Sequence, residues 1–402
     1  MQVPAEQPAA TTFAQGDAPA ICANVEGSYA WDVLHRRHPV LINHLAELHP
    51  YPAAIRQRLA ALSRELADGP IGQLPEDAHD RTAWDAWGEA LFGRPWPDVP
   101  ALWAESYFHR RLLDAVAFFE PGIWFRIDPF TPMKEADLRR AALGEDLRAL
   151  TAPTHLPASD TTLALLLTAL WGNKWDLGFR LGMASVPGRS TLVDHLVVDD
   201  TPAIRDLLHT TAPGRICLVA DNAGPELISD LLLTDHLLHH SLASRVTLQV
   251  KPYPHFVSDA VPADVMSCLR TLAQSAEPVS EVGRRLGAAL RDGRLEVTDH
   301  WFFCSPQPFH HLPDELRAVY AEVDLTIMKG DLNYRRLVGD FHWPPKTDFA
   351  HATAYFPGPV AALRVHKSEV VVGVEATRLR SLAANDTAWR TDGRYGTAQL
   401  RT

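Results

Sequence analysis

Oxygen-bearing side chains gather in the stretch ADNAGPELISD, residues 220–230, directly after an apolar run at 216–220. A turn between a strand and a helix needs only one Asn or Gly, so this concentration of carboxylates and amides calls for an explanation. Asp221 and Asn222 come first, at the carboxyl end of the expected strand. The next apolar run is followed by YPHFVSD, which ends in Asp259. Two carboxylates and an amide oxygen form a ligand set that suits Mg²⁺ or Mn²⁺.

The same residues also have a plainer interpretation. Asp221 and Asn222 can form a turn and cap the helix that follows, and Asp259 can cap the next helix. From spacing alone, the sequence slightly favours this capping role over a metal site. Both interpretations stay open at this point.

A third strand end adds positive charge. The segment MKGDLNYRRLVGD, residues 328–340, leaves an apolar run through a polar, Gly-containing turn that carries Asp331, Asn333 and Arg335. Such a turn offers backbone N–H groups to an anion, and Arg335 can add a bidentate phosphate contact. Another expected strand, in RVHKSEVVVG, supplies Lys367. A metal site that faces a small cationic pocket is the arrangement that phosphoryl chemistry requires.

The elements that must position these side chains differ between the two halves of the chain. Before about residue 171, apolar residues recur three and four apart, which indicates helices. After about residue 190, short apolar runs alternate with helical patterns, which indicates a mainly parallel sheet that binds ligands beyond the carboxyl ends of its strands. The expected helices are 54–66, 101–119, 134–150, 161–170, 226–240, 263–273 and 313–322, and the expected strands are 215–220, 246–251, 295–298, 325–328 and 363–366.

Composition narrows the class of protein. The chain has 402 residues, of which 46% are hydrophobic and 22% are charged, as in a globular protein of two or three domains. A net charge of −11 argues against a broad nucleic-acid surface. The four cysteines form no CxxC pair, and no signal peptide or membrane-spanning apolar run is visible. We therefore expect a cytoplasmic protein without a nucleic-acid, membrane or obligate protein partner.

Several motifs in order carry a family resemblance. DNAGPELISDLLLTDHLL, HFVSD, KGDLNYRRLVGD and RVHK resemble successive landmarks of subfamily III of the damage-control phosphatases, most clearly from about 160 to 375. The resemblance implies an α/β fold, with a three-layer α/β/α Rossmann-like domain, a mainly parallel sheet and a helical N-terminal domain. The expected organisation is a flexible leader at 1–24, a helical domain at 25–165, a catalytic domain at 166–385 and a C-terminal tail at 386–402.

The resemblance also implies roles for individual residues. The cofactor would be a divalent cation, Mn²⁺ or Mg²⁺, with Co²⁺ or Ni²⁺ as further options. Its ligands would be Asp221, Asn222 and Asp259. The substrate-binding residues would be Asp331, Asn333, Arg335 and Lys367. Glu226 begins the helix after the metal pair, where it either supports the metal ligands or simply complements the helix dipole.

The implied activity is metal-dependent hydrolysis of small phosphorylated metabolites, with sugar phosphates as the expected substrates. The family's Arg-Thr-x-Lys signature corresponds to RVHK, so Val365 replaces the usual Thr, which can alter a hydrogen bond near Lys367. Methyl transfer from S-adenosylmethionine to protein glutamate is an alternative that is also attributed to this family. It ranks lower, because DNAG stands where a Gly-rich nucleotide loop is expected. A member repurposed for one phosphorylated biosynthetic intermediate is a further alternative.

Overall fold

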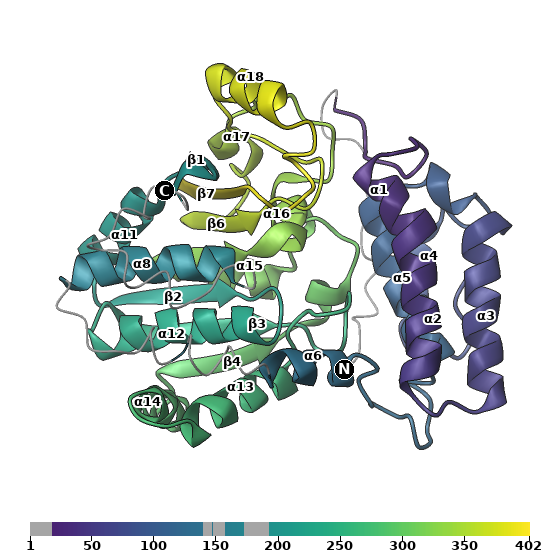
Figure 1. Cartoon of the computed structure of the whole chain (residues 1–402), viewed down its shortest axis with the longest axis horizontal. Helices are drawn as coiled ribbons and strands as arrows, with labels where there is room; N and C mark the ends of the chain where they lie inside the picture. The colour runs from purple at the N-terminus through teal and green to yellow at the C-terminus, as the bar shows by residue number, and fades with distance from the viewer. Residues whose placement is uncertain (1–17, 140–146, 148–156, 173–192) are drawn as a thin grey trace.

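The computed structural model describes residues 18–139, 147, 157–172 and 193–402. The chain forms a helical half and a sheet half, which lie side by side (Figure 1). The helical half is the purple and dark blue part of Figure 1. Its elements are α1 (Tyr29–Asp32), the π-helix η1 (Val33–Arg37), α2 (His38–Leu48), α3 (Ala53–Asp68), α4 (Arg81–Gly88), the 3₁₀ turn η2 (Trp96–Asp98) and α5 (Ala101–Ala115).

Helical spacing of apolar residues explains the elements of this half. In α3 the buried side chains are Ile55, Leu59, Leu62 and Leu66, which recur four, three and four residues apart and so form one apolar stripe. This helix confirms the prediction for 54–66. The predicted helix 101–119 exists as α5 but ends four residues early, at Ala115. Ala117 has φ 62°, a left-handed conformation that cannot continue a right-handed helix.

The sheet half is built on seven strands in the order β1-β7-β6-β5-β2-β3-β4. All neighbouring pairs are parallel except β6 and β7, which are antiparallel. The mainly parallel α/β fold expected from the sequence is thereby confirmed. The strands are β1 (Leu196–Asp199), β2 (Gly214–Val219), β3 (Ala243–Val250), β4 (Leu295–Asp299), β5 (Leu325–Lys329), β6 (Val360–Val365) and β7 (Gly396–Arg401).

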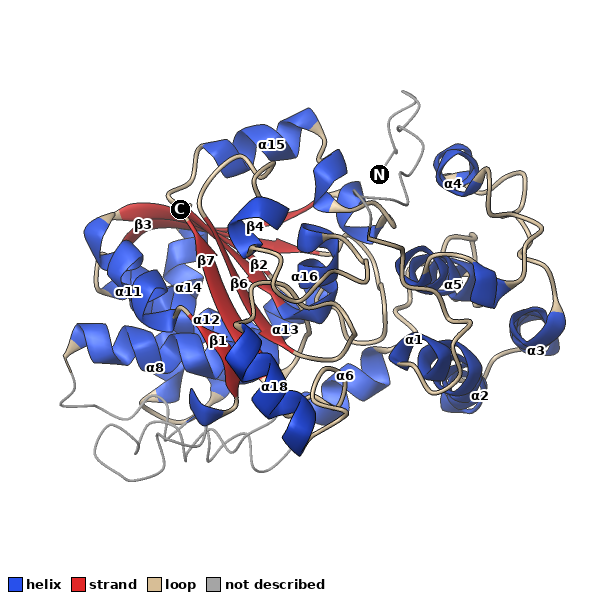
Figure 2. Ribbon diagram, turned by 90° about the horizontal axis from the view of Figure 1, so that it is seen from above, coloured by secondary structure: helices blue, strands red, loops and turns tan. Residues whose placement is uncertain are grey.

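Helices cover both faces of this sheet (Figure 2). Successive side chains of β2 alternate between two hydrophobic cores: Ile216 and Leu218 belong to one, Cys217 and Val219 to the other. The first core includes α8 (Ala158–Trp171), α11 (Thr201–Thr210), α12 (Pro225–His239), α13 (Pro262–Gln274) and α14 (Val279–Arg291). The second core includes α15 (Asp314–Ala321), α16 (Gly330–Val338) and α17 (Phe349–Ala352), and it continues into the helical half.

Two expected boundaries need correction. Residues 386–402, expected to be a tail, contain β7, which lies between β1 and β6 inside the sheet. The sequence GTAQLR hides this strand, because Leu400 is its only large aliphatic residue. The sheet half also begins before residue 166, since α8 starts at Ala158 and packs against α11 and α12. Of the helix predicted at 134–150, α6 (Thr131–Leu138) is seen, and 140–146 and 148–150 lie outside the described residues.

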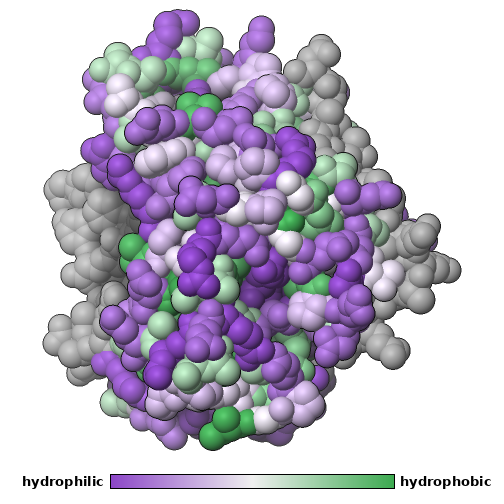
Figure 3. Space-filling view, turned by 90° about the vertical axis from the view of Figure 1, so that its right-hand side faces the viewer, coloured by the Kyte–Doolittle hydropathy of each residue, from purple (hydrophilic) through white to green (hydrophobic). Residues whose placement is uncertain are grey.

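The remaining elements are short, apart from one helix of ten residues. They are the 3₁₀ turns η4 (Trp301–Cys304) and η5 (Phe309–His311) and helix α18 (Ala376–Asn385). The outward face of the helical half is mainly hydrophilic, with hydrophobic residues scattered over it (Figure 3). Within the part of the chain that the structure describes, none of the helices has both the length and the apolar character needed to cross a bilayer.

Candidate active site

The topology of the sheet creates a crevice between β2 and β5. From β2 the chain continues to β3 and β4 on one side, and it then returns to β5 and β6 on the other side. The loops that leave β2 and β5 therefore diverge, which opens a ligand site at the carboxyl ends of these strands. Asp221 and Asn222 follow β2, and Gly330 and Asp331 follow β5. The sheet thus brings two of the polar strand ends predicted from the sequence to one place.

The three predicted metal ligands converge in this crevice. Asn222 and Asp259 form an isolated antiparallel bridge. The backbone N–H of Ala260 donates to the carbonyl oxygen of Asp221 over 2.8 Å, so the loops after β2 and β3 are joined. Asn222 Nδ2 donates to Asp221 Oδ2 over 2.8 Å, and Ser258 Oγ donates to Asn222 Oδ1 over 2.5 Å. Backbone pairing and side-chain hydrogen bonds therefore hold two carboxylates and one amide together.

The alternative role of these residues as helix caps is not supported. Helix α12 begins after Gly224, and its N-cap makes no side-chain hydrogen bond. Helix α13 begins after Val261, whose backbone N–H donates to Asp264 Oδ2 over 3.0 Å. Asp221, Asn222 and Asp259 thus stand in front of these helices without capping them, so their concentration needs another explanation.

A glycine lets the two strand ends approach each other. Gly330 has φ 83°, in the left-handed region that favours glycine. A Cβ atom at this position would lie 2.0 Å from Asp221 Cγ, far inside van der Waals contact. The backbone after β5 therefore packs directly on the Asp221 carboxyl group, which only a residue without a side chain permits.

Burial and mutual repulsion disfavour the charged form of the acidic cluster. Burial, followed by repulsion from Glu226 and Asp259, raises the pKa of Asp221 well above its ordinary range. Burial raises the pKa of Asp259 to about 6, even though Lys251 Nζ lies 3.5 Å from Asp259 Oδ2. That oxygen is buried and accepts no hydrogen bond. A divalent cation would relieve both the repulsion and the unsatisfied oxygen.

The chemistry of the donor set fits a hard cation. Two carboxylates and an amide oxygen are the ligands that Mg²⁺ and Mn²⁺ prefer, with water or substrate oxygens completing the shell. Among the described residues, no group of three His, Cys, Asp or Glu side chains has an arrangement that could hold a metal. The candidate site therefore depends on the amide of Asn222 as its third protein ligand.

A buried ion network supports Asn222 from behind. Glu226 Oε2 accepts a hydrogen bond from Asn222 Nδ2 over 2.9 Å. The Nζ atom of Lys329, which is fully buried, lies 3.4 Å from Glu226 Oε1 and 2.8 Å from Asp230 Oδ1. Glu226 therefore does more than complement a helix dipole, because it connects Asn222 to Lys329. Sequence reasoning assigned no role to Lys329 or Asp230, although Glu226 and Asp230 stand four residues apart on one helix face.

Lys367 supplies positive charge opposite the acidic cluster. It is half-buried and lines the same cavity as Asp221 and Asp259. Burial by itself would lower the pKa of Lys367, but attraction to Asp221, Glu226 and other nearby carboxylates raises it. The ammonium group therefore stays charged and is available to an anionic ligand.

Asp331 holds the loop that carries Lys367. Its Oδ1 accepts hydrogen bonds from Arg364 Nε over 2.7 Å, from the backbone N–H of Lys367 over 3.2 Å and from Ser368 Oγ over 3.2 Å. The guanidinium of Arg364 also lies over the ring of Tyr334, 4.3 Å from its centroid. Asp331 lines the cavity, as the sequence predicted, but much of its hydrogen-bonding capacity is used to fix the protein.

The other two predicted substrate contacts are engaged elsewhere. Asn333 is fully buried and is not among the residues that line the cavity. Its Nδ2 donates to the carbonyl oxygens of Ala220 and Lys329, so this geometry does not support a direct substrate contact. Arg335 lines the cavity but makes four hydrogen bonds to the carboxylates of Glu105 and Asp340. It thereby joins the sheet half to α5 of the helical half.

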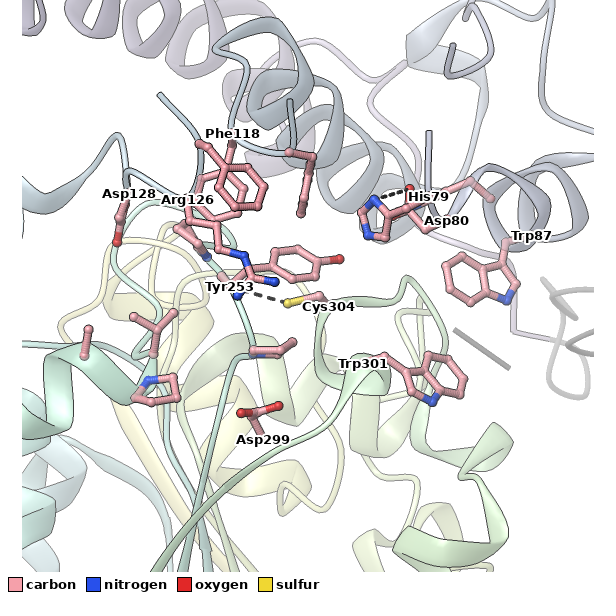
Figure 4. A pocket seen from close by; sticks show the side chains of 18 residues that line it. His79, Asp80, Trp87, Phe118, Arg126, Asp128, Tyr253, Asp299, Trp301 and Cys304 are labelled. Carbon is pink, nitrogen blue, oxygen red and sulfur yellow. Dashed lines mark hydrogen bonds and ion pairs between the residues drawn. The ribbon is translucent and has the colours of Figure 1, made fainter. Parts of the chain in front are cut away.

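The cavity that contains these groups has a volume of about 580 Å³. A second cavity of about 710 Å³ shares no lining residue with it. Figure 4 shows this second cavity, whose walls include the aromatic side chains of Trp87, Phe118, Tyr253 and Trp301. Two of its three acidic residues are already paired, Asp80 with Arg110 at 2.7 Å and Asp128 with Lys134 at 3.0 Å. We therefore assign the chemistry to the smaller cavity.

The chain is similar to known proteins over most of its length. Residues 33–381 match the family model described as the damage-control phosphatase ARMT1-like domain. The damage-control phosphatase ARMT1 of Mus musculus is 30% identical over 96% of this chain and 99% of that protein. Its counterpart from Danio rerio is 27% identical over 95% and 96%. A crystal structure of a DUF89 family protein from Pyrococcus horikoshii has the same fold, with a TM-score of 0.51, 15% identity and coverage of 92% of this chain and 98% of that one.

Proposed function

The chain belongs to the ARMT1-like damage-control phosphatase family, and on that premise we propose that it is a metal-dependent phosphatase of small phosphorylated metabolites, with sugar phosphates as its expected substrates. Membership of this family supports a phosphatase activity. The observation that most supports the finer proposal is the pairing, within one cavity, of the Asp221–Asn222–Asp259 cluster with the charged Lys367.

A divalent cation is the proposed cofactor, with Asp221, Asn222 and Asp259 as its protein ligands. Mn²⁺ and Mg²⁺ suit this oxygen set best, and Co²⁺ and Ni²⁺ are further options. When bound, the cation supplies Lewis acidity for a phosphoryl oxygen and a nucleophilic water. The buried Oδ2 of Asp259 supports this proposal, because it accepts no hydrogen bond among the described residues and has the 3.5 Å ion pair with Lys251 to offset its burial.

The chain's own groups would bind and orient the phosphate. Lys367 would offer its ammonium group to the phosphoryl oxygens, where a charge-assisted hydrogen bond offsets the developing negative charge. Helix α16 begins at Gly330, in the same crevice, and the N-terminus of a helix favours an anion. Asp331 would keep Lys367 in place through the hydrogen bonds to its loop. The buried Lys329 would keep Glu226, and through it Asn222, in position.

The proposal is tested with purified protein and a panel of phosphorylated metabolites in the presence of Mn²⁺, Mg²⁺, Co²⁺ or Ni²⁺. We expect phosphate release that excess EDTA abolishes and that added metal restores. Activity that persists undiminished in EDTA would contradict the metal requirement. Hydrolysis of phosphate diesters or anhydrides in place of monoesters would contradict the proposed substrate class.

A binding measurement separates the metal site from the activity. Asp259→Asn nearly keeps the shape of the side chain but removes one negative charge, so we expect calorimetric affinity for Mn²⁺ to fall by at least tenfold while the melting temperature is kept. Asp292→Asn is a matched control, because the Asp292 side chain is 60% exposed and pairs only with Arg294 over 3.5 Å among the described residues. Equal Mn²⁺ affinities of the two variants would exclude Asp259 as a ligand.

A further inference from the structure

The candidate cavity is lined by two chemically different groups of side chains. The strand-end residues and Lys367 are polar. The helical half contributes polar and charged residues, Arg36, Arg37, His44 and Glu105 among them, and also the apolar residues Val33, Val40 and Leu41. Together with Met133 of α6 and Phe256 of the loop after β3, these three form what we call the apolar end. At about 580 Å³, the cavity lies within the range of about 300–1,000 Å³ typical of pockets that enclose drug-sized ligands. A phosphate with a single sugar ring is smaller than such a ligand and would leave the apolar end unfilled.

The apolar end presents side chains that have no complete protein covering. Val40 is 66% exposed, which places it among the most exposed large hydrophobic residues of the described chain. Leu41, Met133 and Phe256 are half-buried and line the same cavity. Apolar surface in a concave wall gains free energy when an apolar ligand removes it from water. This end therefore favours an uncharged, apolar part of a ligand.

The polar groups near this wall are poorly suited to a second phosphate. Burial lowers the pKa of His109 to about 3 and that of His38 well below its ordinary range, so both imidazoles are neutral. At the cavity margin, Arg37 and Arg36 are 2.7 Å and 3.7 Å from the carboxylate of Asp32, which neutralises one of their two positive charges. Their side chains are 55% and 71% exposed, so solvent screens the remaining charge, and it attracts an anion less strongly than the half-buried Lys367.

We infer that the preferred substrates are phosphomonoesters of amphiphilic alcohols, in which a hydroxylated part lies next to the phosphate and an apolar group extends toward Val40, Leu41 and Met133. The phosphate would anchor the molecule at the strand ends, and the apolar group would fill the wall built by the helical half. The inference deepens the proposed phosphatase function and rests on it.

The test compares glucose 6-phosphate with octyl glucoside 6-phosphate, below the micelle concentration and at saturating Mn²⁺. The two substrates share the reacting phosphate and differ at the anomeric carbon, where the octyl compound carries its chain; methyl glucoside 6-phosphate, which is also fixed as one anomer, controls for the glycosidic bond. We expect kcat/KM to be at least tenfold higher for the octyl compound. Equal values would overturn the inference while leaving the phosphatase proposal intact. Absence of hydrolysis of either compound and of p-nitrophenyl phosphate would overturn the proposed function, and the inference with it.

A double variant tests the location of the apolar end. Val40→Asn combined with Met133→Gln should bring the ratio of kcat/KM for the octyl compound to kcat/KM for glucose 6-phosphate close to one. The matched control is Val319→Asn combined with Met266→Gln, because these residues are 37% and 51% exposed on α15 and α13, outside the cavity. The control should keep the preference. An unchanged preference in the cavity variant would place the apolar contact elsewhere and contradict the inference.

Octyl glucoside without phosphate provides a second readout. It should inhibit glucose 6-phosphate hydrolysis competitively in the wild type and several-fold more weakly in the cavity variant. Inhibition of equal strength in both proteins would also contradict the inference, because it would show that the octyl chain does not contact this wall.

Discussion

Lys367 is the cation for which the structure offers the clearest phosphate-binding role. Lys329 and Lys134, in contrast, are buried in ion pairs with acidic residues. We predict that Lys367→Ala lowers kcat/KM for any hydrolysed phosphomonoester on the order of 10²-fold, because a charge-assisted hydrogen bond to an anion contributes about 1.5–3 kcal/mol. Steady-state kinetics would measure the loss. Lys346→Ala, at an exposed position, serves as the control and should match wild type. Kinetics of the Lys367 variant that also match wild type would reject the role.

Asp331 makes hydrogen bonds within the protein, whereas its position after β5 suggests a substrate contact. From the sequence, a carboxylate beside the phosphate would be expected to recognise sugar hydroxyls. In the structure it accepts three hydrogen bonds from Arg364 and the loop of Lys367. Asp331→Ala would leave Arg364 buried without its carboxylate and would release the loop. We therefore predict losses of similar proportion, at least tenfold, for glucose 6-phosphate and p-nitrophenyl phosphate.

The comparison of these two substrates decides between the roles of Asp331. A much larger loss for glucose 6-phosphate than for p-nitrophenyl phosphate, measured at equal metal saturation, would show that Asp331 reads hydroxyl groups. Thermal unfolding gives an independent readout, since removal of one partner from a buried ion pair costs about 3–5 kcal/mol of stability. An unchanged melting temperature would contradict the structural role.

For individual residues, the sequence predicted which side chains follow a strand, but it did not predict which residues these side chains contact. Asp221, Asn222 and Asp259 could be selected because strand ends in a parallel sheet meet at one edge. The ion pair between Arg335 and Glu105 could not be predicted from the sequence, because Glu105 lies 230 residues away in the chain and belongs to the helical half. The hydrogen bond of Asn333 could not be predicted for the same reason, because its acceptor, the carbonyl oxygen of Ala220, lies 113 residues away.

At the scale of elements, the turn between β5 and α16 sets the geometry of the site. Gly330→Ala would place a methyl group 2.0 Å from Asp221 Cγ and force a left-handed backbone on a residue with a side chain. We predict a loss of stability of about 2 kcal/mol or more, since the backbone conformation alone costs about 1–2 kcal/mol. We also expect Mn²⁺ affinity to fall. Chemical denaturation and calorimetry would measure the two effects.

Gly287→Ala is the matched control for this prediction. Gly287 lies inside α14, where an added Cβ would meet only Arg291 Nη1, at 3.7 Å. The substitution should therefore stabilise the protein by about 0.5–1 kcal/mol through better helix formation. If Gly330→Ala were equally harmless, the result would contradict the close packing of the β5 turn on Asp221.

Elements were predictable where their pattern was long and apolar. Strand β5 is buried throughout, and β2 and β3 are buried in their carboxyl-terminal parts; all three were expected within a few residues of their bounds. The two missed strands are β1, with four residues, and β7, with few large apolar side chains. Both are held in place mainly by their pairing with neighbouring strands, which depends on segments far away in the chain.

At the scale of the whole molecule, the cavity belongs to both halves. The strand ends supply the acidic cluster and Lys367, and the helical half supplies the opposite wall. The Arg335 ion pairs to Glu105, at 3.1 Å, connect these two parts beside the cavity. On the proposed function, we expect the helical half to select among phosphorylated substrates and the sheet half to carry out the hydrolysis. This division explains why the motifs found in the sequence lie in one half although the cavity needs both.

The C-terminal strand β7 lies inside the sheet, between β1 and β6, and we expect the fold to need it. Strand β7 pairs with β6 along its whole length, from Val360↔Arg401 to Val365↔Gly396, and it pairs with β1 on its other side. We predict that a chain ending at Gly393 is insoluble or aggregates at 25 °C, because β6 would become an exposed apolar edge and β1 would lose its neighbour. Removal of Thr402 alone, which lies beyond β7 and is exposed, should leave the melting temperature unchanged. Soluble expression, size-exclusion chromatography and thermal unfolding would compare the two truncations. A soluble monomer that ends at Gly393 and keeps the wild-type melting temperature would show that residues 394–402 act as the tail expected from the sequence and not as a strand of the core.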